Sequence, residues 1–229
     1  MDVAIRFQEV TKEFSGVRAL SDVTFDVRAG EAHALCGENG AGKSTLIRLL
    51  GGVWPSGSYT GSIRLHGTVA QFRSVRDAER AGIAVIHQEL ALVPDMSAAE
   101  NMLLGREPLR RGVVDFAAMR AAAAGAFDRL GASIDPSTPV RQLGVGGRQL
   151  VAIGAALLRD ARILVLDEPT SALTESEAAR LLAIVRSLRD SGVTVIYISH
   201  RLDEILAVAD AVTVLRDGEH VGSWRAENV

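Results

Sequence analysis

Apolar and polar positions follow a strand pattern in the first part of the chain and a helix pattern in the middle. VTFDV (23–27) alternates apolar and polar residues, as a half-buried antiparallel strand does, and EAHALC (31–36) is a predicted strand that leads into glycine-rich sequence. KSTLIRLL (43–50) then predicts a helix, and GSIRLHG (61–67) and IAVIH (83–87) are further predicted strands.

Between residues 97 and 160 the pattern becomes helical. Ser97 with Glu100 forms a capping-box pattern, and Asp115 is placed to cap an alanine-rich helix that ends at Leu130 before Gly131. No low-complexity linker or internal repeat interrupts the chain, so we expect this stretch to be a subdomain inserted into the surrounding domain.

The last third of the chain alternates apolar runs with helical segments. In order, we expect strand RILVL (162–166), a helix over 175–190 capped by Thr174 with Glu177 and followed by Gly192, strand VTVIYI (193–198), a short helix near 201–208, strand AVTVL (211–215), and a turn at Asp217-Gly218 into EHVGSW. Continuous apolar strands that alternate with helices predict an α/β fold whose mainly parallel sheet is covered on both faces.

Composition narrows the class of protein. The 229 residues are 48% hydrophobic and 23% charged, with mean hydropathy +0.18, which is enough apolar sequence for a packed core. A net charge of −3 without a basic block argues against binding nucleic acid through bulk charge. The early charges in MDVAIRFQEV disfavour a signal peptide, no run of about 18 apolar residues predicts a membrane span, and Cys36 is the single cysteine. We therefore expect a soluble cytosolic protein.

Lysine is scarce, which draws attention to where it occurs. Of 25 basic residues, only Lys12 and Lys43 are lysine. Lys43 lies in GENGAGKST (37–45), which matches the phosphate-loop pattern G-x-x-x-x-G-K-[ST] between a predicted strand and a predicted helix. In such a loop the glycines let backbone N–H groups surround phosphate oxygens, the ammonium binds the β- and γ-phosphates, and Ser44 offers a hydroxyl to Mg²⁺. The alternative is a purely structural glycine turn. The predicted phosphate-binding positions are Gly37, Glu38, Asn39, Gly40, Ala41, Gly42, Lys43, Ser44 and Thr45.

Polar residues also follow three other predicted strands. Asp167 and Glu168 come at the carboxyl end of RILVL, where open α/β sheets bind their ligands. Asp167 can hold Mg²⁺, and Glu168 can polarise an attacking water. Gln88 follows IAVIH and His200 follows VTVIYIS in the same way. Each alone has an ordinary loop or cap as its alternative, but four strands that end in the groups required for nucleotide hydrolysis predict such a site.

The order GENGAGKS, Gln88, LGVGGRQ, LDEP and His200 resembles the ATP-binding cassette (ABC) ATPases over essentially all 229 residues. FQEVTKEFSGVRALSDVTFDV, GIAVIHQELALVPDMSAAENMLLGRE and ISHRLDEI are similar to ATPase subunits of carbohydrate-uptake importers of the ribose, arabinose and galactose type. The resemblance implies one domain with the P-loop NTPase fold of ABC ATPases. In it, about 1–88 and 162–229 form an antiparallel β-subdomain and the nucleotide-binding core, and about 89–161 form an inserted α-helical subdomain.

The resemblance also implies ATP and Mg²⁺ as cofactors and a role for single residues. Glu168 would be the catalytic carboxylate, and His200 would contact the γ-phosphate. Gln88 would reach Mg²⁺ and the attacking water while sensing the membrane subunit. Phe14 would stack on adenine, and a core aromatic residue is the alternative for it. Ser171-Ala172-Leu173 would cross to a partner cassette.

LGVGG (143–147) stands where the family has its signature, usually leucine-serine-glycine-glycine-glutamine. In the family two cassettes pack head to tail, and each signature caps ATP held by the other. Gly144 replaces the serine and Gly147 the glutamine, and loss of the hydroxyl should weaken that contact about 10- to 100-fold. The alternative is a helix-capping turn. The residues predicted to contact the nucleotide of a partner are Leu143, Gly144, Val145, Gly146 and Gly147.

The importers of this type carry two cassettes on one chain, and this sequence has one phosphate loop, so we expect the N-terminal half of a tandem ATPase or else a single-cassette subunit. Its expected partners are a second cassette, membrane permease subunits and, indirectly, a periplasmic sugar-binding protein, but no nucleic acid. Its expected place is the cytoplasmic face of the plasma membrane, held there by the permease. Two alternatives are a soluble ABC ATPase that acts on nucleic acid or ribosomes, and a regulatory cassette that binds ATP with little hydrolysis.

Overall fold

The N-terminal strand pattern folds into an antiparallel sheet. In the computed structural model of the chain, which describes residues 2–228, this sheet has the strand order β2-β1-β4-β5. VTFDV lies in β2, where Val23, Phe25 and Val27 are buried and Thr24 is exposed. The predicted half-buried antiparallel strand is therefore confirmed. The strands of this sheet are β1 (Val3–Phe14), β2 (Val17–Arg28), β4 (Thr60–Leu65) and β5 (Thr68–Val69).

A second sheet, of order β12-β11-β3-β10-β9-β6, forms the centre of the domain. Its neighbouring strands run parallel except for β12, which pairs antiparallel with β11 across the predicted turn at Asp217 and Gly218. These two residues have φ of 50° and 80°, as a tight hairpin turn requires. The predicted mainly parallel sheet is therefore confirmed. Its strands are β3 (Ala32–Cys36), β6 (Ile83–Ile86), β9 (Ile163–Asp167), β10 (Thr194–Ile198), β11 (Ala211–Arg216) and β12 (Glu219–Arg225).

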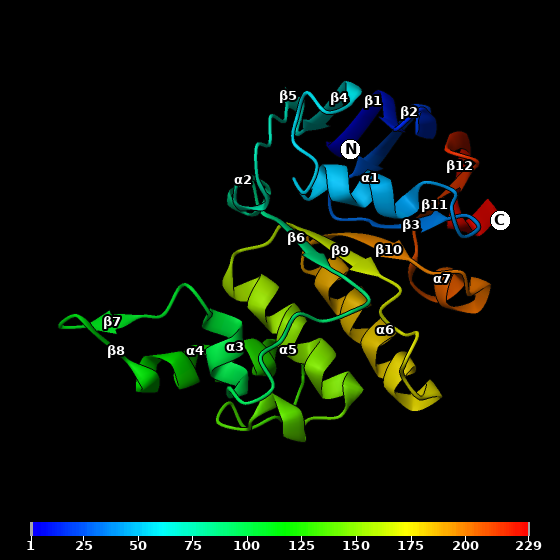
Figure 1. Cartoon of the computed structure of the whole chain (residues 1–229). Coiled ribbons are helices and arrows are strands. Elements are labelled where there is room, and N and C mark those ends of the chain that lie inside the picture. The colour runs from blue at the N-terminus through cyan, green and yellow to red at the C-terminus, as the bar shows by residue number, and fades with distance from the viewer. Residues whose placement is uncertain (1, 229) are drawn as a thin grey trace.

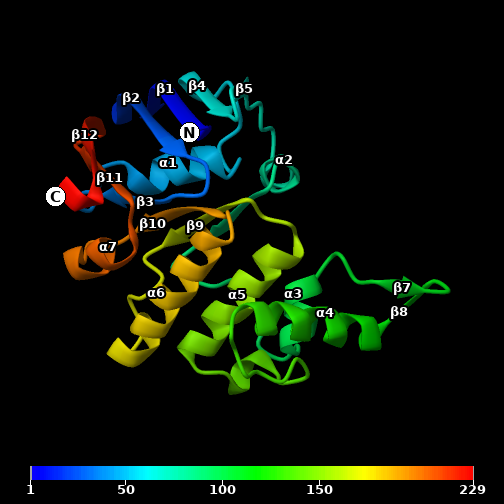
Figure 2. The same cartoon turned by 180° about the vertical axis from the view of Figure 1, so that it is seen from behind.

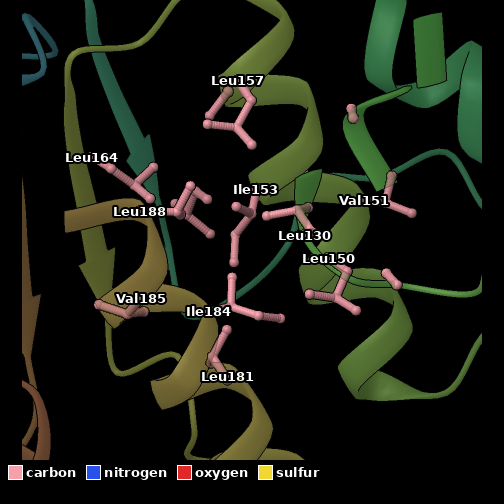
Figure 3. Close-up of a cluster of buried hydrophobic side chains, with 14 of the residues drawn as sticks. Leu130, Leu150, Val151, Ile153, Leu157, Leu164, Leu181, Ile184, Val185 and Leu188 are labelled. Carbon is pink, nitrogen blue, oxygen red and sulfur yellow. The ribbon is translucent and has the colours of Figure 1, made fainter. Parts of the chain in front are cut away.

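Both faces of the central sheet are covered, which explains why its strands are apolar at nearly every position. Leu164 of β9 packs with α5 and α6 in one apolar cluster, whereas Ile163 packs with α1 and the antiparallel sheet in another. Figures 1 and 2 show α1 between the two sheets and α5 and α6 on the opposite face, and Figure 3 shows Leu164 facing Leu157 and Leu188 of those helices. The helices are α1 (Lys43–Leu50), α2 (Val75–Arg80), α3 (Ala98–Leu103), α4 (Phe116–Arg129), α5 (Val145–Leu158), α6 (Glu175–Asp190) and α7 (Leu202–Val208), with short 3₁₀ helices η1 (Val140–Gln142) and η2 (Ala226–Asn228).

The predicted helix caps are present. The Ser97 hydroxyl accepts a hydrogen bond from the Glu100 N–H (3.3 Å), and the Glu100 carboxylate accepts one from the Ser97 N–H (2.8 Å). Thr174 and Glu177 make the same box at α6, and Asp115 caps α4. The sequence pattern missed α2 and the hairpin of β7 (Leu109–Arg110) and β8 (Val113–Val114), because elements of six and two residues are too short to show a period.

The connections bring the sequence motifs to one edge of the central sheet. β3, β10, β9 and β6 are consecutive neighbours, and their carboxyl ends lead into the phosphate loop, His200, Glu168 and Gln88, respectively. α3, α4 and the β7–β8 hairpin lie beyond α5, away from the antiparallel sheet (Figure 1), and the boundaries of this helical subdomain at about 89–161 stay a prediction. Within residues 2–228, no helix is long and apolar enough to cross a membrane.

Candidate functional site

A cavity of about 650 Å³ opens where β3, β10, β9 and β6 end. Of the predicted phosphate-loop positions, Ala41 is buried and does not line this cavity. A cavity of about 740 Å³ between the antiparallel sheet and β12 contains none of the predicted residues. The structure thus brings four separate sequence motifs to one place. The lining residues are Ala19, Gly37, Glu38, Asn39, Gly40, Gly42, Lys43, Ser44, Thr45, Gln88, Asp167, Glu168 and His200.

The phosphate loop has a backbone shape that depends on its glycines. Gly37, Gly40 and Gly42 have φ of 147°, 87° and 99°, values that residues with a Cβ atom rarely adopt. A Cβ at Gly37 would lie 2.2 Å from the Leu215 carbonyl oxygen, so this glycine is required by both conformation and space. A Cβ at Gly40 would meet nothing within 4 Å, since this residue lines the open cavity.

The loop and the start of α1 are suited to bind an anion. Lys43 is buried except for 8% of its surface, and its ammonium donates to the carbonyls of Gly37 (2.6 Å) and Glu38 (2.9 Å). The N-cap of α1 is Gly42, without a side-chain cap, and the first turn has no acidic residue. The first N–H groups of this helix therefore remain available, and the helix dipole adds positive potential at the same point. A phosphate group fits this donor set.

Asp167 and Glu168 occupy different environments although they are adjacent. Burial, followed by repulsion from Glu168, raises the pKa of Asp167, and the charges of His87, Lys43 and Arg48 oppose this rise. A buried carboxylate of this kind is stabilised in its charged form by a bound cation, so it fits a Mg²⁺ site.

Glu168 has φ of 46°, a left-handed backbone that is strained for a residue other than glycine. Its N–H donates to the Ile198 carbonyl on the neighbouring strand (3.0 Å), which helps to hold the strained conformation. Strain that the surrounding sheet maintains in this way is typical of functional positions.

His200 and Gln88 reach the cavity from the two strands that flank β9. His200 Nδ1 lies 3.4 Å from Glu168 Oε1, and its side chain is 66% exposed at the mouth of the cavity. Gln88 Nε2 lies 3.5 Å from Ser171 Oγ, so the loop Ser171-Ala172-Leu173 borders the site. Both residues were predicted from their position after a strand, and the structure places both against the cavity.

Phe14 does not line the cavity. Its ring packs edge-on against Trp54 at 5.2 Å, and the ammonium of Lys12 lies 4.7 Å from the ring centroid. Lys12, the second lysine of the chain, is buried and donates to the Ser58 carbonyl (2.5 Å). The adenine-stacking role of Phe14 therefore stays a prediction. The contacts of Lys12 with Phe14 and Ser58 were not predicted, because the scarcity of lysine in the sequence does not indicate which residues a lysine contacts.

The signature segment 143–147 lies outside the cavity, at the start of α5. Gly144 is the N-cap, with φ −63° and ψ 171°, and it has no side-chain cap. Gly146 and Gly147 lie inside the first turn, and no residue of this segment has positive φ. The glycines are therefore not required for an unusual backbone. Against the family's usual signature, Val145 is a further departure, in addition to Gly144 and Gly147.

Sequence reasoning missed two residues near the site. Ala19 of β2 lines the cavity, and His87 is close enough to affect the pKa of Asp167. His87 directly precedes Gln88 at the end of β6, so its position carried a signal, whereas nothing in the pattern around Ala19 singled it out.

Comparison with known proteins agrees with the geometry. A family model described as "ABC transporter" matches residues 20–171. The chain is 52% identical over 223 residues to the xylose import ATP-binding protein of Moorella thermoacetica, covering 97% of this chain and 44% of that protein. It is 52% identical over 224 residues to a ribose import ATP-binding protein of Burkholderia ambifaria (97% and 44% covered) and 50% identical over 217 residues to an arabinose import ATP-binding protein of the same organism (95% and 41%). The chain thus spans less than half the length of these relatives.

Solved structures share the fold. An ATP-binding cassette of an ABC transporter in its ADP conformation matches with a TM-score of 0.88 and 26% identity, covering 100% of this chain and 94% of that one. A dimeric cassette in a post-hydrolysis state bound to ADP and Pi matches with a TM-score of 0.80 at 22% identity, covering 97% and 98%, which shows the fold alone. The chain has the ATP-binding cassette fold, and it belongs to the ABC transporter family.

Proposed function

We propose that this chain binds and hydrolyses MgATP and that the hydrolysis energises sugar import by an ABC transporter. The observation that carries the proposal is the single cavity shared by the phosphate loop, Gln88, Asp167, Glu168 and His200. The sugar assignment is supported by relatives whose names specify xylose, ribose and arabinose import.

The residues present fit a nucleoside triphosphate with its metal ion. The N–H groups of the loop and Lys43 would hold the phosphates, and the Ser44 hydroxyl, Gln88 and Asp167 would hold Mg²⁺. When bound, Mg²⁺ neutralises part of the phosphate charge that develops during transfer.

The reaction itself requires positioning and proton acceptance. Glu168, at the end of its strand and held by the Ile198 carbonyl, would orient the attacking water and accept its proton. His200, which lies beside Glu168, would donate a hydrogen bond to the γ-phosphate, and Gln88 would complete the orientation of the water. Each of these roles needs the side chain within hydrogen-bond reach of one γ-phosphate position, and the cavity that these residues share supports that arrangement.

The proposed partner at the ATP is a second cassette. Segment 143–147 and the loop 171–173 lie outside or at the border of this chain's own cavity, so they are available to a cassette that packs head to tail. Two further contacts follow from the proposed transporter: the permease at the membrane and, through it, a sugar-binding protein. The chain would then work at the cytoplasmic face of the membrane, as one half of a tandem ATPase.

Two substitutions in the full-length protein test the proposal. Lys43→Ala should remove MgATP binding, because the loop loses its only cation. Glu168→Gln should keep binding and reduce hydrolysis by a factor on the order of 100 or more, since the carboxylate acts on the water and not on the phosphates. Normal hydrolysis by Glu168→Gln would remove that residue from its role.

A regulatory cassette that binds ATP with little hydrolysis is the second candidate. The departures at Gly144, Val145 and Gly147 favour it, because the hydroxyl and amide that the usual signature offers to a partner's ATP are missing. The two candidates differ in steady-state turnover by the full-length protein: the second predicts tight MgATP binding with no phosphate release above that of Glu168→Gln.

A further inference from the structure

Glu204 of α7 is a buried carboxylate outside the cavity. Only 2% of its surface is exposed, and its Oε2 accepts hydrogen bonds from three hydroxyl groups: Thr170 (2.7 Å), Tyr197 (2.8 Å) and Ser199 (3.0 Å). Burial, with the hydrogen bond to Glu204, raises the pKa of Tyr197, so this hydroxyl keeps its proton and remains a donor. A charged group buried in this way needs such compensation to be tolerated.

Two of the three hydroxyl donors belong to the loops that carry the proposed catalytic groups, and Tyr197 lies in β10 itself. Thr170 lies two residues after Glu168, in the loop that leaves β9, and it is itself 4% exposed. Ser199 immediately precedes His200, at the end of β10. One carboxylate oxygen therefore holds both loops at a fixed separation.

The chain on the far side of His200 is attached to the same carboxylate. The Arg201 N–H donates to Ser199 Oγ (3.0 Å), and Arg201 Nη1 lies 3.0 Å from Glu204 Oε1. Within the described residues Oε1 accepts no aligned hydrogen bond, so its contact with Arg201 is an ion pair only. His200 thus projects into the cavity from a turn whose two flanking residues are both held by Glu204.

We infer that Glu204 is a positioning residue that sets the distance between His200 and Glu168 at the cavity. The inference rests on the proposed function, because it assigns catalytic meaning to that distance, which is 3.4 Å between Nδ1 and Oε1. Glu204 has no contact with the phosphate loop among its hydrogen bonds and ion pairs, so it should affect the reaction and not nucleotide binding. A charged acceptor suits the role, since hydrogen bonds to a carboxylate are stronger than those between neutral groups.

Three substitutions in the full-length protein separate the two loops. Glu204→Gln weakens all the contacts. Ser199→Ala removes the two hydrogen bonds beside His200, to Glu204 and from the Arg201 N–H, and Thr170→Val removes the bond beside Glu168. Each should lower kcat on the order of 10- to 100-fold, because small misplacements of catalytic groups have effects of this size, while the Kd for MgATP changes less than about threefold. Asp203→Asn is the matched control: Asp203 also contacts Arg201 (3.1 Å) on the same helix but is exposed, and its kcat should stay within about twofold of wild type.

A double-mutant comparison distinguishes positioning from general stability. In a His200→Ala background, Ser199→Ala should cause almost no further loss of kcat, whereas Thr170→Val should keep most of its effect. Equal losses in both backgrounds would show that Ser199 acts through fold stability, and would overturn the inference for His200.

A second readout needs neither nucleotide nor activity. In the nucleotide-free protein, the imidazole NMR signal that is lost in His200→Ala should shift or broaden in Glu204→Gln and Ser199→Ala, while the other histidine signals stay in place. An unchanged His200 signal in both variants, together with an unchanged kcat, would refute the inference. If the wild-type protein binds MgATP but does not hydrolyse it, the proposed function fails, and the NMR comparison still decides whether Glu204 positions His200.

Discussion

Restoring a serine at Gly144 tests how the signature segment works. Gly144 is the N-cap of α5, and its φ of −63° and ψ of 171° are the extended values that serine adopts at this position. A Cβ there would meet nothing within 4 Å. Serine can therefore enter without strain, and its hydroxyl can accept from the N–H of the first turn.

The stability gain has two sources. Serine caps better than glycine by a few tenths of a kcal/mol, and replacing a glycine that does not need its freedom adds about 0.4–1 kcal/mol through the unfolded state. Together these give roughly 0.5–1.5 kcal/mol, which for a chain of this size is a rise in Tm of about 1–6 °C. Gly144→Ala is the matched control, because it keeps the entropic part but has no hydroxyl, and alanine is a poor N-cap.

Thermal unfolding and ATPase assays of the full-length protein give the two outcomes. Gly144→Ser should be more stable than Gly144→Ala by about 0.5–1 kcal/mol. Turnover should stay within about threefold of wild type if segment 143–147 faces a partner site that contributes little to hydrolysis. Equal stability of the two variants would refute the capping argument, and a gain in turnover of tenfold or more would show that the site capped by this segment limits the reaction.

Four other substitutions probe the scaffold. Gly37→Ala should destabilise the fold by about 3 kcal/mol or more in urea unfolding, because its Cβ would lie 2.2 Å from the Leu215 carbonyl oxygen. Gly40→Ala, whose Cβ would meet open space, should lose only about 1–2 kcal/mol. Similar losses for the two variants would contradict the steric argument. Thr174→Ala removes the capping box of α6 and should reduce the unfolding free energy by about 1 kcal/mol, and a change below about 0.3 kcal/mol would mean that the cap is not formed in solution. Burial raises the pKa of Glu31, but hydrogen bonds from His33 and the Arg28 N–H outweigh it, so the folded pKa lies below the ordinary 4.5. The stabilisation that Glu31 contributes is then complete above the unfolded pKa and is lost as pH falls through the folded pKa. The Tm of wild type should therefore exceed that of Glu31→Gln by a constant amount above about pH 5, and the difference should shrink below that pH. A constant difference down to pH 3 would refute the lowered pKa.

The fold was predictable where local sequence determines local structure. The boxes of Ser97 with Glu100 and of Thr174 with Glu177 have their partners three residues apart, and both formed where the pattern placed them. The apolar runs of the central strands were equally clear, because burial on both faces leaves few polar positions.

The candidate site was predictable to the extent that its residues follow strands. Order in the sheet was not visible in the sequence, so the adjacency of β6, β9, β10 and β3 came only from the structure. Glu204 was missed for a similar reason: its partners Thr170, Tyr197 and Ser199 come from other elements, and a single glutamate on a short helix gives no signal of burial. Positive φ at Glu168 is also invisible in a pattern of residue types.

Crystals of the full-length protein with Mn²⁺ in place of Mg²⁺ and a non-hydrolysable ATP analogue give the most direct test of convergence. We expect one anomalous peak in the cavity, coordinated by the Ser44 hydroxyl and within direct or one-water reach of Gln88 and Asp167. The γ-phosphate should contact Lys43 and His200, with Glu168 facing the in-line water position. A metal and triphosphate bound elsewhere, or bound here with Asp167 and Glu168 turned away from them, would contradict the assignment of this cavity.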